Sequence, residues 1–325
     1  MSYIENFKQY TGSTVANTFF IPMLSGKNAE QLGVKVLYNM PVPTIVTTLT
    51  PNENILQKYT QKGWTGGNAT TRINIEIPMS RVKAENAYSA DDYFSIVYER
   101  ISTLKGMNLD DLSGTELEQA ETEIFREALM ENIRANMWLG DTTQANGLNS
   151  FDGFLKSINT GMSNNEIVPT TFTAADLKNP AKSIAIFRQL WLSASDQLRA
   201  LKSDANLAIY CTSDLCELYE EYLDSVGVNT SYQELVGGRP QLSYHGIPII
   251  DMRFSSYAIP AGLSKSMCML TDRRNLVMAV NTQDMPGNEV RMWYNPDEME
   301  NRQRAIFMAG CEVLDTKLVA VAKLA

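Results

Sequence analysis

Residue types that could carry out catalysis are sparse in this chain. His245 is the only histidine. A Ser-His-Asp or Cys-His arrangement would have to use it, and no sequence feature places a nucleophile beside it. A structural zinc site needs cysteine and histidine at ligand spacing, but Cys211 and Cys216 are five residues apart and have no second pair. We therefore expect no metal, and we expect the four cysteines to be buried thiols.

Acidic residues cluster in one region, where paired carboxylates could in principle catalyse glycoside hydrolysis. The cluster consists of Asp110, Asp111, Glu116, Glu118, Glu121 and Glu123. The glutamates occupy the first turns of a predicted helix, where negative charge interacts favourably with the helix dipole. A solvent-exposed helix start therefore explains them without catalysis.

Glycine pairs in the sequence lack a phosphate-binding pattern. Gly66-Gly67 and Gly237-Gly238 match neither GxxxxGK[ST] nor GxGxxG, so each pair predicts an ordinary turn. The residues on their own predict no catalytic site and no cofactor.

The composition is that of a folded protein of moderate size. The chain has 325 residues, 44% of them hydrophobic and 20% charged, and its net charge is −9. This length exceeds that of most single-core domains, so we expect two domains. The acidic balance argues against binding nucleic acid through a basic surface. No apolar run approaches the ~20 residues of a membrane span, and residues 1–10 lack the features of a secretion signal, which predicts folding in the cytoplasm.

A long amphipathic helix is predicted over residues 115–139. Ser113 and Glu116 form a capping-box pattern at its start. Gly140 is expected to end it in a left-handed conformation. The helix would be roughly 35 Å long at 1.5 Å per residue, and it would be either a strut or an ordinary helix of an α/β enzyme. Apolar residues recur at helical spacing at Leu117, Ala120, Ile124 and Ala128, and at Phe125, Leu129, Ile133 and Met137.

Two predicted strands upstream form a long hairpin. Residues 44–50 are rich in β-branched side chains, and residues 72–79 alternate polar with apolar residues. The segment 62–68 between them is rich in turn residues. Because an isolated two-stranded hairpin is marginally stable, it must pack on its own domain or on a neighbour. Trp64 is therefore either a core residue of its own subunit or an anchor on another chain.

The second half of the chain alternates predicted helices and strands. Asn179 followed by proline starts a helix that is expected to end near Asp204. Residues 207–211 (LAIYC) read as a buried strand, and Ser213 is expected to cap the next helix. This alternation predicts a compact α/β subdomain.

Further strands are predicted toward both ends. Pro248 marks residues 246–250 as an edge strand, because proline cannot donate to a central ladder. The N-terminal forty residues read as an extended arm, in which residues 28–36 could form a short helix. Other strands are predicted at residues 267–270, 276–280, 289–294, 305–314 and 317–325.

Five short motifs follow one another after Ser113. They are WLGD at 138–141, FDGFLKSI at 151–158, YHGIPIID at 244–251, DRRNLVMAV at 272–280, and RAIFMAGCEVLDTKLVAVA at 304–322. In this order, behind an arm, a long hairpin and a long helix, they resemble tailed-phage major capsid proteins of the Hong Kong 97 fold. The resemblance covers most of the chain after Ser113.

The resemblance implies an α+β fold with named segments. These are an N-terminal arm at 1–39, an extended loop (the E-loop) formed by the hairpin and its flanks at 40–90, a peripheral P-domain at 91–149 and 276–325 with a spine helix at about 115–139, and an axial A-domain at 150–275.

The implied function is structural and not enzymatic. Such a protein self-assembles into the icosahedral or prolate shell of a tailed double-stranded DNA bacteriophage and encloses the genome. Its implied partners are other copies of itself in pentamers and hexamers, a scaffolding protein, a portal and decoration proteins, with no membrane. It would be made in the host bacterial cytoplasm and reside in the virion capsid. Two alternatives stay open: an encapsulin-like nanocompartment shell, and a small-molecule hydrolase or transferase in the α/β region.

Two groups of site residues follow from this interpretation. A turn is predicted around Gly140, Asp152 and Gly153, with Gly153 permitting a positive φ angle. Candidates for contact between subunits lie on the arm and the hairpin, at Phe19, Phe20, Lys62, Trp64, Gly66, Gly67 and Asn68.

Overall fold

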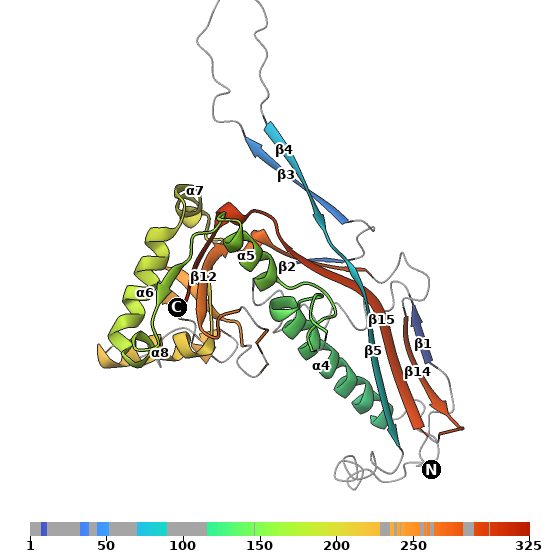
Figure 1. Cartoon of the computed structure of the whole chain (residues 1–325). Coiled ribbons are helices and arrows are strands. Elements are labelled where there is room, and N and C mark those ends of the chain that lie inside the picture. Colours follow the sequence, from blue (N-terminus) through green and yellow to red (C-terminus); the bar gives the residue numbers. More distant parts are fainter. Residues whose placement is uncertain are drawn as a thin grey trace, which may run out of the picture.

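The computed structural model describes residues 8–11, 33–38, 44–51, 70–89, 116–145, 147–227, 235–236, 239–240, 242–253, 257, 259–260, 263–281, 289–298 and 300–325. In this part the chain forms an α+β structure with two six-stranded sheets, a projecting hairpin and a set of helices (Figure 1). None of the helices in these ranges is both long and apolar enough to cross a membrane.

One sheet, here called the long sheet, is organised around β15. This strand pairs antiparallel with β5 along one side and with β14 and β13 along the other. β1 is antiparallel to β14, and β2 is parallel to β13. The strands are β1 (Lys8–Thr11), β2 (Lys35–Tyr38), β5 (Ser80–Ser89), β13 (Leu276–Asn281), β14 (Glu289–Asn295) and β15 (Glu300–Val313).

Helix α4 (Glu116–Leu139) covers one face of the long sheet (Figure 1). Alternate residues of the first part of β15 are buried, which is the pattern of a strand covered on one face. Phe125 and Leu129 of α4 belong to the same buried cluster as Ala305 and Phe307 of β15. Of the two apolar rows predicted from helical spacing, the one with Phe125 and Leu129 is therefore the face that α4 buries. The prediction is wrong for the other row, because Ile124 and Ala128 are exposed.

The other sheet, here called the compact sheet, has the strand order β10-β11-β7-β12-β16-β6. β16 lies inside it, antiparallel to β12 and parallel to β6. The strands are β6 (Thr170–Phe172), β7 (Leu207–Cys211), β10 (Ser243–Tyr244), β11 (Ile247–Asp251), β12 (Met267–Asp272) and β16 (Val319–Leu324). A separate two-stranded pair is formed by β8 (Leu235–Val236) and β9 (Arg239–Pro240).

Helices α6 and α8 pack on the compact sheet and share a buried cluster with it. Phe187 of α6 and Tyr219 of α8 meet edge to face, with ring centroids 5.2 Å apart. The helices of this half are α5 (Phe154–Ser163), α6 (Pro180–Ser193), α7 (Asp196–Ala200) and α8 (Ser213–Ser225), with 3-10 turns η2 (Asp176–Lys178), η3 (Leu201–Asp204), η5 (Arg273–Asn275) and η6 (Thr316–Leu318).

Asn275 ties together two connections between the sheets. The chain passes from β12 to β13 through η5 and from β15 to β16 through η6. The buried Asn275 side chain donates from Nδ2 to the Asp315 carbonyl at 2.9 Å, and its Oδ1 accepts from the Asp315 amide at 2.7 Å. These bonds satisfy a buried amide and hold both crossings at one point.

The hairpin of β3 (Thr44–Pro51) and β4 (Thr70–Ile77) projects away from both sheets (Figure 1). At its base, Ile77 is buried against Val277 and Ala279 of β13. The chain then turns into β5 and crosses β15 at Gly310. A Cβ atom at Gly310 would lie 2.1 Å from the Pro78 carbonyl oxygen, so a side chain there would force the two segments apart.

Several sequence predictions are confirmed. The long helix spans Glu116–Leu139, close to the predicted 115–139. The two strands of the hairpin pair antiparallel, with Thr44 opposite Ile77. Leu207–Cys211 is a fully buried strand, and the four cysteines are buried free thiols.

Two predicted helix boundaries are wrong, and in both cases a serine hydroxyl forms a hydrogen bond that was not predicted. The helix from Pro180 does not continue to Asp204. It ends at Ser193, and Ser195 caps the separate α7 by accepting from the Leu198 amide at 3.2 Å. Ser213 is not a cap but the first residue of α8, and its hydroxyl donates to the Asp251 carboxylate at 2.9 Å.

Two predictions about strands are also wrong. Residues 35–36 belong to β2 and not to a short helix, because they pair with β13. β11, which contains Pro248, is not an edge strand, because β10 pairs beyond it. Pro248 is tolerated because the ladder with β7 begins only at Ile249, whose amide donates to Leu242 on the other side.

Candidate functional site: the α4–α5 junction and the projecting hairpin

The predicted site residues fall into two groups. Gly140, Asp152 and Gly153 lie together where the end of α4 meets the start of α5. The predicted contact residues of the arm and hairpin tip lie outside the described residues; they are Phe19, Phe20, Lys62, Trp64, Gly66, Gly67 and Asn68.

The backbones of Gly140 and Gly153 are in close contact. The Gly153 amide donates to the Gly140 carbonyl at 2.9 Å, and the Gly140 amide donates to the Asn136 carbonyl at 2.8 Å. A Cβ atom on Gly140 would lie 2.1 Å from the Phe151 carbonyl oxygen, and one on Gly153 would lie 2.6 Å from the Asn136 carbonyl oxygen. Both positions therefore require glycine because a backbone occupies the space of a side chain.

The conformational reasons predicted for these glycines are wrong. Gly153 has φ −93° and ψ 169°, an extended conformation that any residue can adopt. Gly140 does not have the positive φ angle of a left-handed helix cap. Chain crowding from residues distant in sequence makes both glycines necessary, and a sequence motif of local turns does not reveal such crowding.

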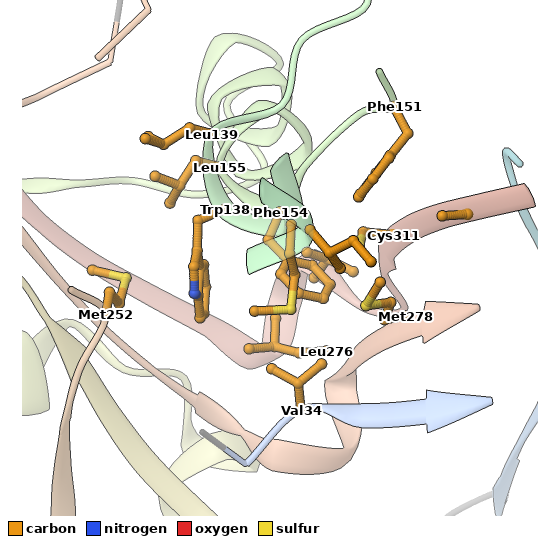
Figure 2. Close-up of a cluster of buried hydrophobic side chains, with 14 of the residues drawn as sticks. Val34, Trp138, Leu139, Phe151, Phe154, Leu155, Met252, Leu276, Met278 and Cys311 are labelled. Carbon is orange, nitrogen blue, oxygen red and sulfur yellow. The ribbon is translucent and has the colours of Figure 1, made fainter. Parts of the chain in front are cut away.

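Trp138 joins this junction to the compact sheet. Its side chain is fully buried beside Phe154 of α5 (Figure 2), and the two ring centroids are 5.4 Å apart. The ring centroid of Tyr210 on β7 lies 5.6 Å from that of Trp138. The Tyr210 hydroxyl in turn donates to the Gly33 carbonyl at 3.2 Å. The indole of this α4 residue thus packs against both α5 and the compact sheet, a role that sequence reasoning missed.

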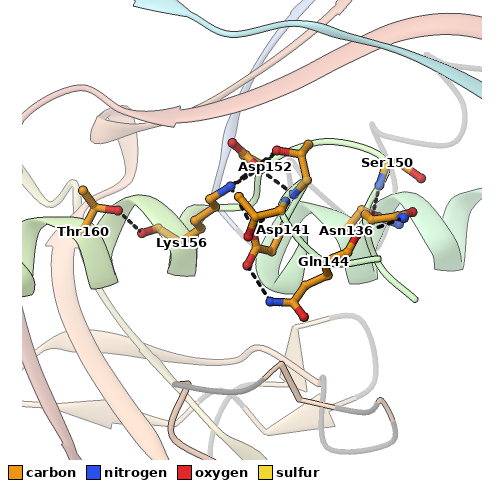
Figure 3. Close-up of polar contacts among 10 residues, drawn as sticks. Asn136, Asp141, Gln144, Ser150, Asp152, Lys156 and Thr160 are labelled. Carbon is orange, nitrogen blue, oxygen red and sulfur yellow. Dashed lines mark hydrogen bonds and ion pairs between the residues drawn. The ribbon is translucent and has the colours of Figure 1, made fainter. Parts of the chain in front are cut away.

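Lys156 forms an ion-pair cluster on the polar side of the junction (Figure 3). Its Nζ atom lies 2.7 Å from Asp141 at the end of α4 and 2.7 Å from Asp152 before α5. Asp152 also accepts from the amide and the hydroxyl of Thr142, each at 2.8 Å. The i,i+4 spacing of Asp152 and Lys156 was a signal in the sequence that could have identified this pair.

The cluster shifts the pKa values of its members. Partial burial on its own would raise the pKa of Asp141, but hydrogen bonds from Lys156, Thr143 and Gln144 outweigh it and hold the pKa well below its usual range. The pKa of Asp152 is also lowered, because hydrogen bonds from Lys156 and Thr142 outweigh its desolvation. Desolvation opposes the charge of Lys156, yet its two carboxylate partners raise its pKa. All three groups are therefore ionised near neutral pH.

The projecting hairpin has two different faces, because side chains alternate along each strand. One, here called the apolar face, carries the cross-strand pairs Val46–Ile75 and Thr48–Ile73. The opposite face, here called the mixed face, carries Ile45 and Glu76, then Thr47 hydrogen-bonded to Asn74. Ile73 on the apolar face is 50% exposed, and Ile45 on the mixed face is 52% exposed.

Features relevant to enzyme chemistry are few in the described ranges. His245 is exposed and lies in the two-residue turn between β10 and β11, where His245 and Gly246 both have positive φ angles. No group of three His, Cys, Asp or Glu side chains in these ranges could hold a metal ion. A cavity between α5 and β12 has a volume of ≈ 10 Å³, enough for about one water molecule.

Solved structures of other proteins match this fold over most of the chain. A chain from the capsid of the native GTA particle has 14% sequence identity and a TM-score of 0.52, and the match covers 91% of this chain and 90% of that one. A chain from the satellite phage P4 procapsid including size determination (Sid) protein has 8% identity and a TM-score of 0.59, with coverage of 95% and 99%. This chain has a capsid-protein fold.

A further match is a chain from Gordonia phage Cozz, with 15% identity, a TM-score of 0.50, and coverage of 91% of this chain and 86% of that one. No protein-family model and no curated protein matches the sequence. At these identities the match concerns the fold, which in this chain includes the long helix, the projecting hairpin and both sheets.

Replacing Gly153 by alanine should destabilise the capsid fold by about 2–3 kcal/mol, because the added methyl group overlaps the Asn136 and Trp138 carbonyls. Denaturant unfolding of the isolated subunit measures this. The matched control is Gly147→Ala, since Gly147 has φ +93° but nothing within 4 Å of its Cβ position. The control should lose only about 1 kcal/mol. Equal losses would contradict the crowding argument.

Replacing Lys156 by methionine should destabilise the subunit by about 2 kcal/mol near neutral pH, because two partly buried carboxylates lose their cation. The folded-state pKa values of Asp141 and Asp152 lie below the unfolded-state values, so their contribution is complete above about pH 4 and is lost as the pH falls. The raised pKa of Lys156 keeps its own contribution complete up to about pH 10.

The difference between wild type and Lys156→Met should therefore be smaller at pH 3 than at pH 7 in denaturant unfolding. The control is Lys83→Met, which breaks the exposed ion pair with Glu85 and should cost less than about 0.5 kcal/mol. A Lys156→Met loss no larger than that of the control, or independent of pH, would refute a stabilising cluster.

Proposed function

We propose that this chain is the major capsid protein of a tailed double-stranded DNA bacteriophage, which self-assembles into an icosahedral or prolate shell around the genome. The observation that carries the proposal is the extent of the fold match. Two capsid structures, the native GTA capsid and the P4 procapsid, align over 91% and 95% of this chain and over 90% and 99% of their own chains. The structural role is inferred by analogy from this match of the fold over nearly the full length.

The segments implied by the sequence resemblance can be assigned to this architecture. We take α4 with β13, β14 and β15 of the long sheet as the P-domain with its spine helix, and the compact sheet with α6 and α8 as the A-domain. β3 and β4 form the base of the E-loop within 40–90, and residues 1–39 form the arm. β16 falls within the range 276–325 predicted for the P-domain, but it pairs with β12 and β6, so we assign this last strand to the A-domain.

Assembly in this proposal depends on the apolar face of the hairpin. A two-stranded hairpin is marginally stable by itself. Its base is buried against β13 through Ile77, and the same face continues outward through Val46, Ile75 and Ile73. A second copy of the chain is the occupant that would cover this row. Burying the exposed half of an isoleucine contributes roughly 1 kcal/mol, so many weak contacts act together in a closed lattice.

The remaining partners follow from the capsid role. The shell would contain pentamers and hexamers of this chain and a portal, with a scaffolding protein during assembly and decoration proteins outside. It would enclose DNA without sequence-specific contacts, which agrees with a net charge of −9. Assembly would take place in the host cytoplasm, and the protein would reside in the virion.

The experiment that tests this function is expression of the full chain, alone and with the products of neighbouring genes, followed by light scattering and electron microscopy. We expect closed shells, or rings of five and six subunits. Shells that enclose a cargo enzyme instead of DNA would indicate an encapsulin-like compartment. A monomer or dimer under every condition would overturn the structural role.

Within that assay, Ile73→Asp should prevent shell formation while leaving the melting temperature of the subunit nearly unchanged, because it places a charge in the interface and not in the subunit core. Ile45→Asp is the matched control: it lies on the same hairpin with almost the same exposure but on the mixed face. Normal shells from Ile73→Asp, or equal loss from both variants, would refute docking through the apolar face.

A further inference from the structure

The structure brings two cysteine thiols into contact in the buried cluster that the compact sheet shares with α6 and α8. Cys211 is the last residue of β7, and Cys216 lies in the first turn of α8. Their Sγ atoms are 2.6 Å apart. We propose that Cys211 and Cys216 form an oxidation site, which closes to an intrachain disulfide when the protein meets a peroxide.

The turn between the two cysteines holds them on the same side. Thr212 is bonded to Met267 of β12 in both directions: its amide donates to the Met267 carbonyl at 3.1 Å, and its hydroxyl accepts from the Met267 amide at 3.3 Å. The Cys216 amide donates to the Thr212 carbonyl at 3.2 Å. These bonds hold the end of β7 and the start of α8 against β12. Both thiols belong to one buried cluster.

The other two cysteines, Cys268 and Cys311, show whether oxidation is specific to the Cys211–Cys216 pair. Cys268 on β12 is the direct partner of Cys211 in the antiparallel ladder, so it lines the same region. Cys311 belongs to the other buried cluster, around the long sheet. The inference therefore predicts which sulfur atoms react with each other, and not only that cysteines are present.

Burial decides the order of the reaction. Cys211 is fully buried, which raises its pKa well above the ordinary value, whereas Cys216 is 7% exposed. The Cys216 sulfur is thus the one that a small oxidant reaches first. It attacks one oxygen of hydrogen peroxide, so that an S–O bond forms, the O–O bond breaks, and the leaving hydroxide takes up a proton to become water.

The second step joins the two residues. The Cys211 sulfur attacks the sulfur of the Cys216 sulfenic acid, the S–S bond forms, the S–O bond breaks, and a second water leaves with the Cys211 proton. Two thiols lose two electrons in total, and one peroxide is reduced to two water molecules. The product connects the end of β7 to α8, and it would persist outside the reducing cytoplasm.

This inference goes beyond the capsid role and does not depend on shell formation. The test uses the purified full chain, reduced and then treated with hydrogen peroxide, unfolded, and alkylated to count free thiols. We expect two of the four thiols to disappear, peptide mass mapping to link Cys211 with Cys216, and a dithiol reductant to restore all four.

Matched variants separate this site from general oxidation. Cys216→Ala should keep its remaining thiols free, whereas Cys311→Ala should lose the same pair as the wild type. If Cys216→Ala does not fold, mapping of the wild type still decides the question. Four free thiols after peroxide treatment that fully oxidises glutathione would overturn the proposal. So would a Cys211–Cys268 link, or a Cys216 sulfinic acid without a link.

Discussion

The architecture depends on the close approach of two backbones where α4 meets α5. Gly140 and Gly153 allow carbonyl oxygens to occupy the space that side chains would otherwise fill. That contact places Trp138 between α5 and β7, so one indole packs against helices and strands from both halves of the molecule. Because protein interiors are close-packed, a displacement at this point would be transmitted to the long sheet and the compact sheet together.

The same kind of contact positions the projecting hairpin. The chain crosses β15 at Gly310, beneath the Pro78 carbonyl, and Ile77 anchors the base of the hairpin on β13. Beyond this anchor the hairpin has no second layer within the described residues. A well-packed base and an uncovered apolar face suit an element that extends toward another molecule, which is the physical basis of the assembly proposal.

Polar side chains stabilise two connections: the turn between α4 and α5, and the crossings between the two sheets. Lys156 neutralises carboxylates from both sides of the α4–α5 turn. Asn275 binds the Asp315 backbone and so ties the two strand crossings. In each case a side chain satisfies groups from segments that are distant in sequence or separated by a turn. These bonds therefore act on the relative placement of the elements more than on the elements themselves.

The sequence by itself determined the elements whose signals are local. Helical spacing predicted α4, alternation predicted the strands of the hairpin, and an apolar run predicted β7, because each pattern reflects one buried face of one segment. The order of five motifs also indicated a capsid fold. Tertiary structure alone decided why Gly140 and Gly153 are glycines, why Pro248 is tolerated inside a sheet, and which thiols meet. Those properties depend on contacts between segments that only folding brings together, and a local sequence pattern does not record such contacts.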